Sequence, residues 1–408
     1  MDIPAPIRNI LLRLHRAGYA AYAVGGCIRD ALLGLEPHDW DVCTAAAPGE
    51  VEAVFSDCRC LETGLRHGTV TVLWEGRGVE ITTFRTDGAY RDGRHPESVR
   101  FTASLEEDLA RRDFTCNAMA WDGVGGIVDP FGGRDDLRRG LLRCVGEPER
   151  RFREDALRLL RALRFAARYG FTVEPATGAA LHREAALLGR VSAERCFSEL
   201  KGILCAPHAG DVLREYGDVL RPILPELSPE GGTSAEEWEV TCRALDAAPA
   251  EEVLRLALLL RGRQAGEILR RLRCDRATLR AAEELAALCL LPPPDTPAAQ
   301  RRELSQLGEE QSLRLARLRL ALAEGRGQGA GAARKALELQ AAALREGGCL
   351  TLRELAVDGS DLLALGVRPG AELGALLRGL LDAVLGGDAP NEREALLALA
   401  RERIGDSA

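Results

Sequence analysis

The spacing of hydrophobic and polar positions changes near residue 140. Before that point, short apolar runs typical of strands alternate with helical segments, and the runs are AAYAV (20–24), WDVC (40–43), TVTVLW (69–74), VEITTF (79–84) and SVRF (98–101). From about residue 137 onward, Ala, Leu, Arg and Glu recur with helical periodicity, interrupted by clusters of Gly and Pro. The pattern predicts an α+β head, a mixed sheet with helices, followed by an elongated all-α remainder.

We expect four parts: a head over 1–140, a helical neck over 141–205, a helical body over 206–345 and a helical tail over 346–408. The aromatic residues support the main division, because 16 of the 18 Phe, Trp and Tyr residues precede residue 200. With only two aromatic residues after residue 200, aromatic stacking cannot be the main way in which the body and tail bind a partner.

The net charge of −8 would by itself argue against a nucleic-acid partner. However, segment 137–170 carries ten Arg against four acids, and segment 261–280 carries seven Arg against two acids. Basic patches on an acidic chain are compatible with a polyanionic partner that binds at particular places. Run 261–280 is therefore the best candidate for a phosphate-contacting face, with a solvated helix as the equal alternative.

No apolar run approaches the roughly 20 residues that span a bilayer. The first 20 residues contain charges and lack the apolar core of a signal peptide, so we expect a cytoplasmic protein with no membrane partner. The 12 Cys residues include no C-x-x-C pair and are expected to be reduced thiols. A zinc site through Cys58, Cys60 and His67 is disfavoured by its poor ligand spacing.

The densest chemical signal is YAVGGCIRDALLGLEPHDWDVCT (22–44). A strand ends at Gly25-Gly26 and a helix follows, which lets backbone N–H groups approach an anion closely. Arg29, in the first turn of that helix, adds a charged donor for phosphate. A simple tight turn is the alternative explanation of two glycines.

Asp39 and Asp41 flank Trp40, so strand alternation places both carboxylates on one face. Such a pair repels itself unless a cation lies between the two groups, and hard oxygen ligands suit Mg²⁺ together with substrate phosphates. Glu80, in the middle of the run GVEITTF, is a candidate third carboxylate, and a structural salt bridge is its alternative role.

Two further segments carry candidate residues. In RRDFTCNAMA (111–120), Arg112 is a candidate phosphate contact, whereas Asp113 and Asn117 are expected to hold the site together by capping and hydrogen bonds. Glu154, Asp155, Arg158, Arg161 and Arg164 are expected on one helix, where the three Arg lie on neighbouring faces. A solvated, ion-paired helix face would also explain them.

Four motifs in this order resemble the class II nucleotidyltransferases, the family of bacterial CCA-adding enzymes and poly(A) polymerases: GGCIRD with DWD, VEITTFR, RRDFTCNAMA and REDALRLLRALRF. The resemblance covers residues 20–205 strongly and 350–404 more weakly. It implies a polymerase-β-like head that transfers nucleotides by a two-metal mechanism, with CTP, ATP and the 3′ acceptor end of tRNA as substrates.

The resemblance also implies roles for individual residues. Asp39 and Asp41 would hold Mg²⁺, with Glu80 beside them. Gly26, Arg29 and Arg112 would hold the triphosphate. Asp155 and Arg158 match the family's base-reading pair, and Arg161 and Arg164 would reach phosphate or ribose or brace that pair.

The chemistry of the bases fits this pair. Cytosine and adenine each place an amine donor beside a ring-nitrogen acceptor, which a carboxylate and a guanidinium complement. Guanine and uracil place a carbonyl beside an N–H, so both contacts would be mispaired, at about 1–3 kcal/mol each.

Several other functions remain open on the sequence alone. A poly(A) polymerase is disfavoured because TGLRHGTVTV (63–72) is similar to the CCA-adding type. CC-only enzymes lack part of the loop after the third carboxylate, and TDGAYRDGRHP (86–96) is complete in this sequence, which favours full CCA addition over CC-only or A-only addition. A small-molecule nucleotidyltransferase would leave the helical body and the Asp155/Arg158 pair unexplained. A non-catalytic RNA-binding protein would have no use for acids beside a phosphate loop.

Overall fold

The computed structural model describes residues 3–64, 68–88, 99–327 and 329–405. The chain forms two compact units, residues 1–234 and 235–408. The boundary between them falls inside the expected body, and the finer division into four parts stays a prediction. One lysine lies in each unit, Lys201 in the first and Lys335 in the second. No helix in the described part of the chain is long and apolar enough to cross a membrane.

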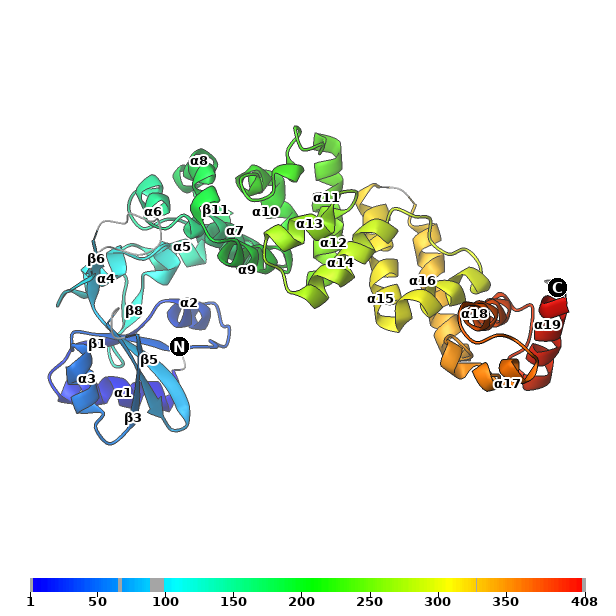
Figure 1. The fold of residues 1–408 in the computed structure, drawn as a ribbon. Coiled ribbons are helices and arrows are strands. Elements are labelled where there is room, and N and C mark those ends of the chain that lie inside the picture. The colour runs from blue at the N-terminus through cyan, green and yellow to red at the C-terminus, as the bar shows by residue number, and fades with distance from the viewer. Residues whose placement is uncertain (1–2, 65–67, 89–98, 328, 406–408) are drawn as a thin grey trace. The chain divides into compact units, whose positions relative to one another are not determined.

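The first unit begins with a seven-stranded mixed sheet of order β3-β4-β5-β2-β1-β8-β9 (Figure 1). Its strands are β1 (Ala21–Val24), β2 (Asp41–Thr44), β3 (Arg59–Gly64), β4 (Thr69–Trp74), β5 (Arg77–Thr83), β8 (Ala120–Trp121) and β9 (Ile127–Val128). Strands β2 and β5 are parallel, and the other neighbouring pairs are antiparallel. The predicted mixed sheet is confirmed, and its strands β3, β8 and β9 were not anticipated.

Helices and short strands complete the first unit. Around the sheet lie α1 (Ala5–Arg16), α2 (Gly26–Leu32), α3 (Pro48–Val54), α4 (Leu105–Ala110) and α5 (Gly133–Arg138), with the hairpin β6 (Arg85–Asp87) and β7 (Val99–Phe101). The following segment contains β10 (Leu141–Leu142), α6 (Pro148–Glu154), α7 (Leu157–Tyr169), β11 (Thr172–Val173), α8 (Pro175–Glu184), α9 (Ala193–Leu204) and α10 (Ala209–Tyr216).

Backbone pairing joins the head to the helices that follow it. The N–H of Thr115 donates to the carbonyl of Arg143 over 2.9 Å, and the N–H of Val145 donates to the carbonyl of Asp113 over 3.1 Å. Val145 is also part of a buried cluster with Val24 of β1. The chain beyond residue 140 therefore returns to pack on the sheet.

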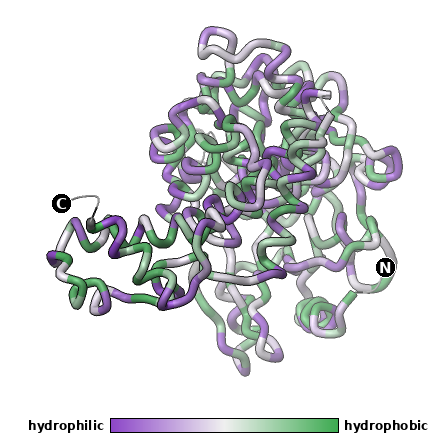
Figure 2. Tube along the Cα trace, turned by 90° about the vertical axis from the view of Figure 1, so that its right-hand side faces the viewer, coloured by the Kyte–Doolittle hydropathy of each residue, from purple (hydrophilic) through white to green (hydrophobic). Residues whose placement is uncertain are grey.

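The second unit consists of helices joined by loops, with no strand among its described residues. Its helices are α11 (Ala235–Ala247), α12 (Glu252–Leu260), α13 (Ala265–Arg271), α14 (Arg276–Leu288), α15 (Pro297–Gly325), α16 (Gly331–Glu346), α17 (Gly359–Ala364), α18 (Ala371–Gly386) and α19 (Arg393–Gly405). Figure 2 shows hydrophobic and hydrophilic stretches alternating along these helical turns, as expected for amphipathic helices. Gly308, with φ 75° and ψ 171°, interrupts α15 with a kink.

Two arginines of the basic run 261–280 take part in this packing. Arg261 is buried and donates to the Thr241 hydroxyl over 2.9 Å and to the carbonyl of Leu258 over 2.8 Å. Arg263 pairs with Glu237. The remaining arginines of the run are exposed, so a phosphate-contacting face there stays a prediction for these residues only.

Phe114 offers a direct test of the packing between head and helices. Its ring is fully buried and meets Phe165 of α7 edge-on, with ring centroids 5.7 Å apart. We expect Phe114→Ala to lower the free energy of unfolding by about 3–5 kcal/mol, because the cavity would lie at this junction. Urea unfolding followed by tryptophan fluorescence measures the loss.

Val124→Ala is the matched control, since Val124 is 81% exposed and should change stability by no more than about 0.5 kcal/mol. Equal urea midpoints for Phe114→Ala and the unmodified protein would show that this contact does not hold the unit together.

Candidate active site

The diglycine makes a sharp bend between β1 and α2. Gly25 has φ 84° and ψ −132°, which L side chains rarely adopt. A Cβ on Gly25 would lie 2.7 Å from Nη1 of Arg112, so the bend also makes room for that guanidinium. Gly26 begins α2, and the first N–H groups of a helix have no partner within it. The bend therefore places backbone donors and one arginine together.

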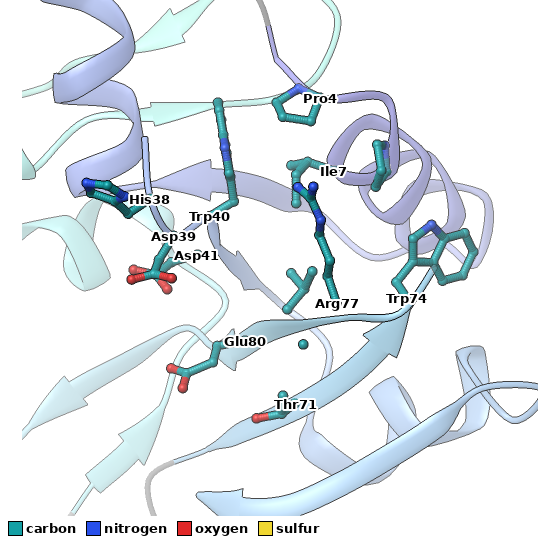
Figure 3. A pocket seen from close by; sticks show the side chains of 13 residues that line it. Pro4, Ile7, His38, Asp39, Trp40, Asp41, Thr71, Trp74, Arg77 and Glu80 are labelled. Carbon is teal, nitrogen blue, oxygen red and sulfur yellow. The ribbon is translucent and has the colours of Figure 1, made fainter. Parts of the chain in front are cut away.

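The two aspartates lie directly beside this bend. Val24, the last residue of β1, pairs with Asp41, the first residue of β2. Asp39 and Trp40 precede the strand rather than belonging to it. Even so, Figure 3 shows the carboxylates of Asp39 and Asp41 side by side, with the Trp40 ring directed elsewhere. The shared face predicted from strand alternation is present.

Glu80 lies on β5, which flanks β2 on the side opposite to β1 and the diglycine. Strand β5 runs parallel to β2 with Ile81 opposite Val42, and Figure 3 shows the Glu80 carboxylate on the same side as the two aspartates. Partial burial raises the pKa of Asp41, the charges of Glu80 and Asp39 raise it further, and Arg112 lowers it. Three acids and one arginine thus act on one another at this point.

This donor set fits a divalent cation. Carboxylates that raise each other's pKa gain most from a cation between them, and oxygen ligands suit Mg²⁺. Among the described residues, no three His, Cys, Asp or Glu side chains form a metal-binding group by themselves. Further ligands would therefore come from substrate phosphates and water, as is usual for Mg²⁺.

Arg29 is 6% exposed and has several partners. Its Nη1 donates to Asn117 over 2.6 Å, and its Nε donates to Asp30 over 2.8 Å. The guanidinium also lies over the rings of Phe165 and Tyr169 of α7, 5.0 and 4.8 Å from their centroids. These contacts join α2 to α7, and a phosphate contact by Arg29 stays a prediction.

Asp113 is the buried centre of the same network. Its carboxylate accepts from the Phe114 N–H over 2.9 Å, from Asn117 over 3.0 Å and from Nε of Arg161 over 2.8 Å. Burial acts to raise the pKa of Asp113, but Arg161, Asn117 and Arg158 outweigh it, so the pKa lies below its usual value. The expected structural role of Asp113 and Asn117 matches this geometry.

The predicted base-reading helix is corrected by the structure. Helix α6 ends at Glu154 and α7 begins at Leu157, so Asp155 lies in extended backbone between them, with φ −141° and ψ 105°. The Leu157 N–H donates to its carboxylate over 3.1 Å. A side-chain acceptor for an N–H in the first turn favours the start of a new helix, which agrees with α7 beginning just after Asp155.

Asp155 also has a partner that sequence reasoning missed. Nη2 of Arg195, on α9, lies 3.0 Å from Oδ2 of Asp155. No local signal could have found this residue, because it lies 40 positions away in a segment with an ordinary charged-helix pattern. Arg195 therefore holds the Asp155 carboxylate in place through an ion pair from α9.

The three arginines of α7 differ in their surroundings. Arg158 donates to Glu154 over 2.9 Å and to the carbonyl of Arg111 over 3.0 Å. Arg161 binds Asp113, and Nε of Arg164 lies 2.6 Å from Glu199 on α9. Arg161 and Arg164 were expected either to contact phosphate or ribose or to brace the Asp155/Arg158 pair, and these ion pairs agree with bracing.

Two expectations fall partly outside the described residues. Loop 86–96 lies outside them from residue 89 onward, and so does His67 of the disfavoured zinc site. Cys58 and Cys60 are described, and the 12 cysteines, all within the described residues, form no disulfide there.

The comparisons with known proteins cover nearly the whole chain. Residues 21–143 match the Poly A polymerase head domain, residues 170–230 match a probable RNA and SrmB-binding site of polymerase A, and residues 250–400 match a putative tRNA nucleotidyltransferase domain 2. The head fold and these matches define a nucleotidyltransferase.

Individual relatives narrow the class. The CCA-adding enzyme of Limosilactobacillus fermentum is 38% identical over 98% of this chain and 97% of its own length, and that of Geobacillus stearothermophilus is 38% identical over 97% and 96%. The crystal structure of the Bacillus stearothermophilus CCA-adding enzyme in complex with CTP matches with a TM-score of 0.77 at 34% identity, covering 99% of each chain.

The chain belongs to the family of CCA-adding enzymes. The Thermotoga maritima CCA-adding enzyme complexed with tRNA shares the fold at 20% identity, with a TM-score of 0.71 over 98% of this chain and 96% of that one. The predicted family resemblance, fold class and enzyme class are thereby confirmed.

The lowered pKa of Asp113 predicts a pH-dependent loss of stability. A carboxyl whose folded pKa is depressed stabilises the fold above its ordinary pKa of 3.8 and loses that contribution as the pH falls toward the folded value. We expect Asp113→Asn to cost about 3–5 kcal/mol at pH 7, since Arg161 would lose its buried partner. Urea unfolding between pH 7 and pH 3 should show the difference from the unmodified protein shrinking below pH 3.8.

Asp135→Asn provides the control, because Asp135 forms an exposed ion pair with Arg138 and should change stability by less than about 1 kcal/mol. A constant difference at all pH values would contradict the assignment of the charge to Asp113.

Proposed function

We propose that this enzyme adds the complete CCA sequence to the 3′ end of tRNA, transferring CMP from CTP and AMP from ATP without a nucleic-acid template. The observation that carries the proposal is the grouping of Asp39, Asp41 and Glu80 beside the diglycine bend. The full-length similarity to CCA-adding enzymes supports the choice of substrates.

In each transfer, the 3′-hydroxyl oxygen of the RNA forms a bond to the α-phosphorus, and the bond from that phosphorus to pyrophosphate breaks. Asp39 and Asp41 would hold Mg²⁺, which when bound helps to ionise the attacking hydroxyl and to stabilise the leaving pyrophosphate. Glu80 would act as the third carboxylate of the group.

The triphosphate is assigned to the bend. The backbone at Gly26 offers N–H donors. The Arg112 guanidinium lies beside Gly25, and its positive charge acts to lower the pKa of Asp41. Arg29 would add to the positive charge there while its contacts to Asn117 and Asp30 hold it in place. The fixed guanidinium groups would stabilise the charge of the transferring group at no reorganisation cost.

Base selection is assigned to Asp155 and Arg158. Each is anchored by a different neighbour, Asp155 by Arg195 and Arg158 by Glu154. A carboxylate and a guanidinium that are held in place favour bases with an amine beside a ring-nitrogen acceptor, because mispaired groups would lose hydrogen bonds. Arg161 and Arg164 would brace α7 through Asp113 and Glu199.

The direct test uses a tRNA transcript that lacks its 3′ CCA, incubated with CTP, ATP and Mg²⁺, followed by sequencing of the RNA 3′ ends. We expect ends of CCA. Addition that stops at CC, addition of A only to RNA already ending in CC, or long A tails would instead assign the enzyme to CC-adding, A-adding or poly(A) activity.

Replacing either metal-site aspartate should abolish transfer but not RNA binding. We expect Asp39→Asn and Asp41→Asn each to lower kcat at least about 1,000-fold, as losses of central electrostatic groups do. The Kd for tRNA, measured by filter binding, should change less than about twofold. A comparable weakening of RNA binding would contradict the metal assignment.

Replacing the base reader should change selectivity more than rate. We expect Asp155→Ala to reduce the preference for CTP over UTP by about tenfold or more, because one discriminating contact is lost. Single-turnover incorporation of each nucleotide measures the preference. Arg195→Lys is the companion variant, because it keeps a cation beside Asp155. Equal slowing of CTP and UTP incorporation, which leaves the preference unchanged, would make Asp155 a structural residue.

A further inference from the structure

A hollow of about 610 Å³ adjoins the three carboxylates and extends away from them. Besides these acids, its lining includes Trp40, Trp74, Arg77 and residues at the start of α1. Figure 3 shows Asp39, Asp41 and Glu80 together on one side, and the Trp40 and Arg77 side chains extending toward Pro4 on the other. The hollow is therefore acidic at the catalytic end and aromatic at the far end.

The hollow exists because two neighbouring strands start at different levels. Strand β2 begins at Asp41 and pairs with β5 from Val42 and Ile81 onward. Strand β5 already begins at Arg77, after a two-residue turn of Glu75 and Gly76 with positive φ at both positions. Residues 77–80 consequently pair with β4 on one side and extend past the start of β2 on the other.

The order of the strands indicates on which side of the reacting phosphorus this hollow lies. Strand β2 lies between β1, which ends at the diglycine, and β5, which carries Glu80. In phosphoryl transfer the attacking and leaving oxygens lie roughly in line on opposite sides of the phosphorus. If the diglycine side of β2 holds the triphosphate, the attacking hydroxyl reaches the carboxylates from the β5 side, where the hollow lies.

The lining suits a single-stranded nucleotide. The indole ring of Trp40 is a surface on which a base stacks, whereas the Trp74 ring already packs against Phe55 and the Arg13 guanidinium. Arg77 is exposed, lies opposite Trp74 in the hairpin and has no carboxylate partner within the described part of the chain. An anion with an aromatic group would complement Trp40 and Arg77 together.

We propose that this hollow binds the 3′-terminal nucleotide of the RNA substrate, with its base against Trp40 and its phosphate at Arg77. This inference rests on the proposed function, because it assumes an RNA hydroxyl as the attacking group. The base of the incoming nucleotide is assigned to Asp155 and Arg158, so the hollow serves the other substrate. Arg77 offsets the repulsion between the RNA phosphate and the nearby acids.

Arg77→Gln tests the phosphate contact. Each phosphate contact on a single strand contributes about 0.7 to the slope of log K against log salt concentration. For a tRNA transcript lacking CCA, we expect Arg77→Gln to reduce the magnitude of this slope by about 0.7. We also expect it to raise the KM for that RNA several-fold and to leave the KM for CTP unchanged. Arg59→Gln is the matched control, because Arg59 is also exposed on the sheet but lies outside the hollow.

Trp40→Leu and Trp40→Phe test the stacking surface. Loss of a stacked base typically weakens binding by a factor of about 5–150. We expect Trp40→Leu to raise the RNA KM within that range and Trp40→Phe to restore most of it. Displacement of the neighbouring aspartates would instead alter kcat and the KM for CTP.

The outcomes separate this proposal from the proposed function. An unchanged salt slope and RNA KM in Arg77→Gln, or equal effects in Arg59→Gln, would overturn the assignment of the hollow while CCA addition by the unmodified enzyme stands. Failure of the unmodified enzyme to extend tRNA would overturn the proposed function itself.

Discussion

The site depends on a buried charge, the carboxylate of Asp113. It binds Arg161 of α7 on one side and Asn117 on the other, and Asn117 in turn accepts from Arg29 of α2. A continuous chain of hydrogen bonds therefore runs from α2, the helix after the diglycine, to α7, the helix that carries Arg158. Because these groups are buried, each bond is strong and each missing partner would be costly. The chain fixes the diglycine bend relative to α7.

The carboxylates of Asp39, Asp41 and Glu80 show the opposite arrangement, since they are exposed and repel one another. Sheet order brings Asp41 and Glu80 together, because β1 and β5 flank β2, and Asp39 lies just before the start of β2. The backbone ladder supplies the stability that these side chains do not. A rigid sheet can hold like charges in place until a cation binds them, which a mobile loop could not do.

Much of the head could be predicted from the sequence because its signals are local. The alternation around Trp40 placed two carboxylates on one face, and the strand runs at 20–24 and 69–74 correspond to β1 and β4. Strand β3 was missed because CRCLETG mixes polar and small residues without a clear apolar face. The spacing of the charged residues predicts one continuous helix through Asp155, but its carboxylate accepts from the Leu157 N–H and the chain breaks between α6 and α7 at that point.

Other features depend on tertiary contacts and have no local signal. Arg195 reaches Asp155 across 40 positions, and Arg261 is buried against backbone carbonyls although it opens an apparently basic surface run. Arginine supports several such roles because its planar group has five donors. Composition alone does not distinguish an arginine that meets solvent from one that holds helix ends together.

The scarcity of lysine has a practical consequence. Lys201 lies on α9 in the first compact unit and Lys335 on α16 in the second, and the chain has no other lysine. Acylating dyes that react with amines would therefore attach at one side chain in each unit, in addition to the α-amine of the chain. Energy transfer between fluorophores on these two side chains would report the distance between Lys201 and Lys335 without any engineered cysteine.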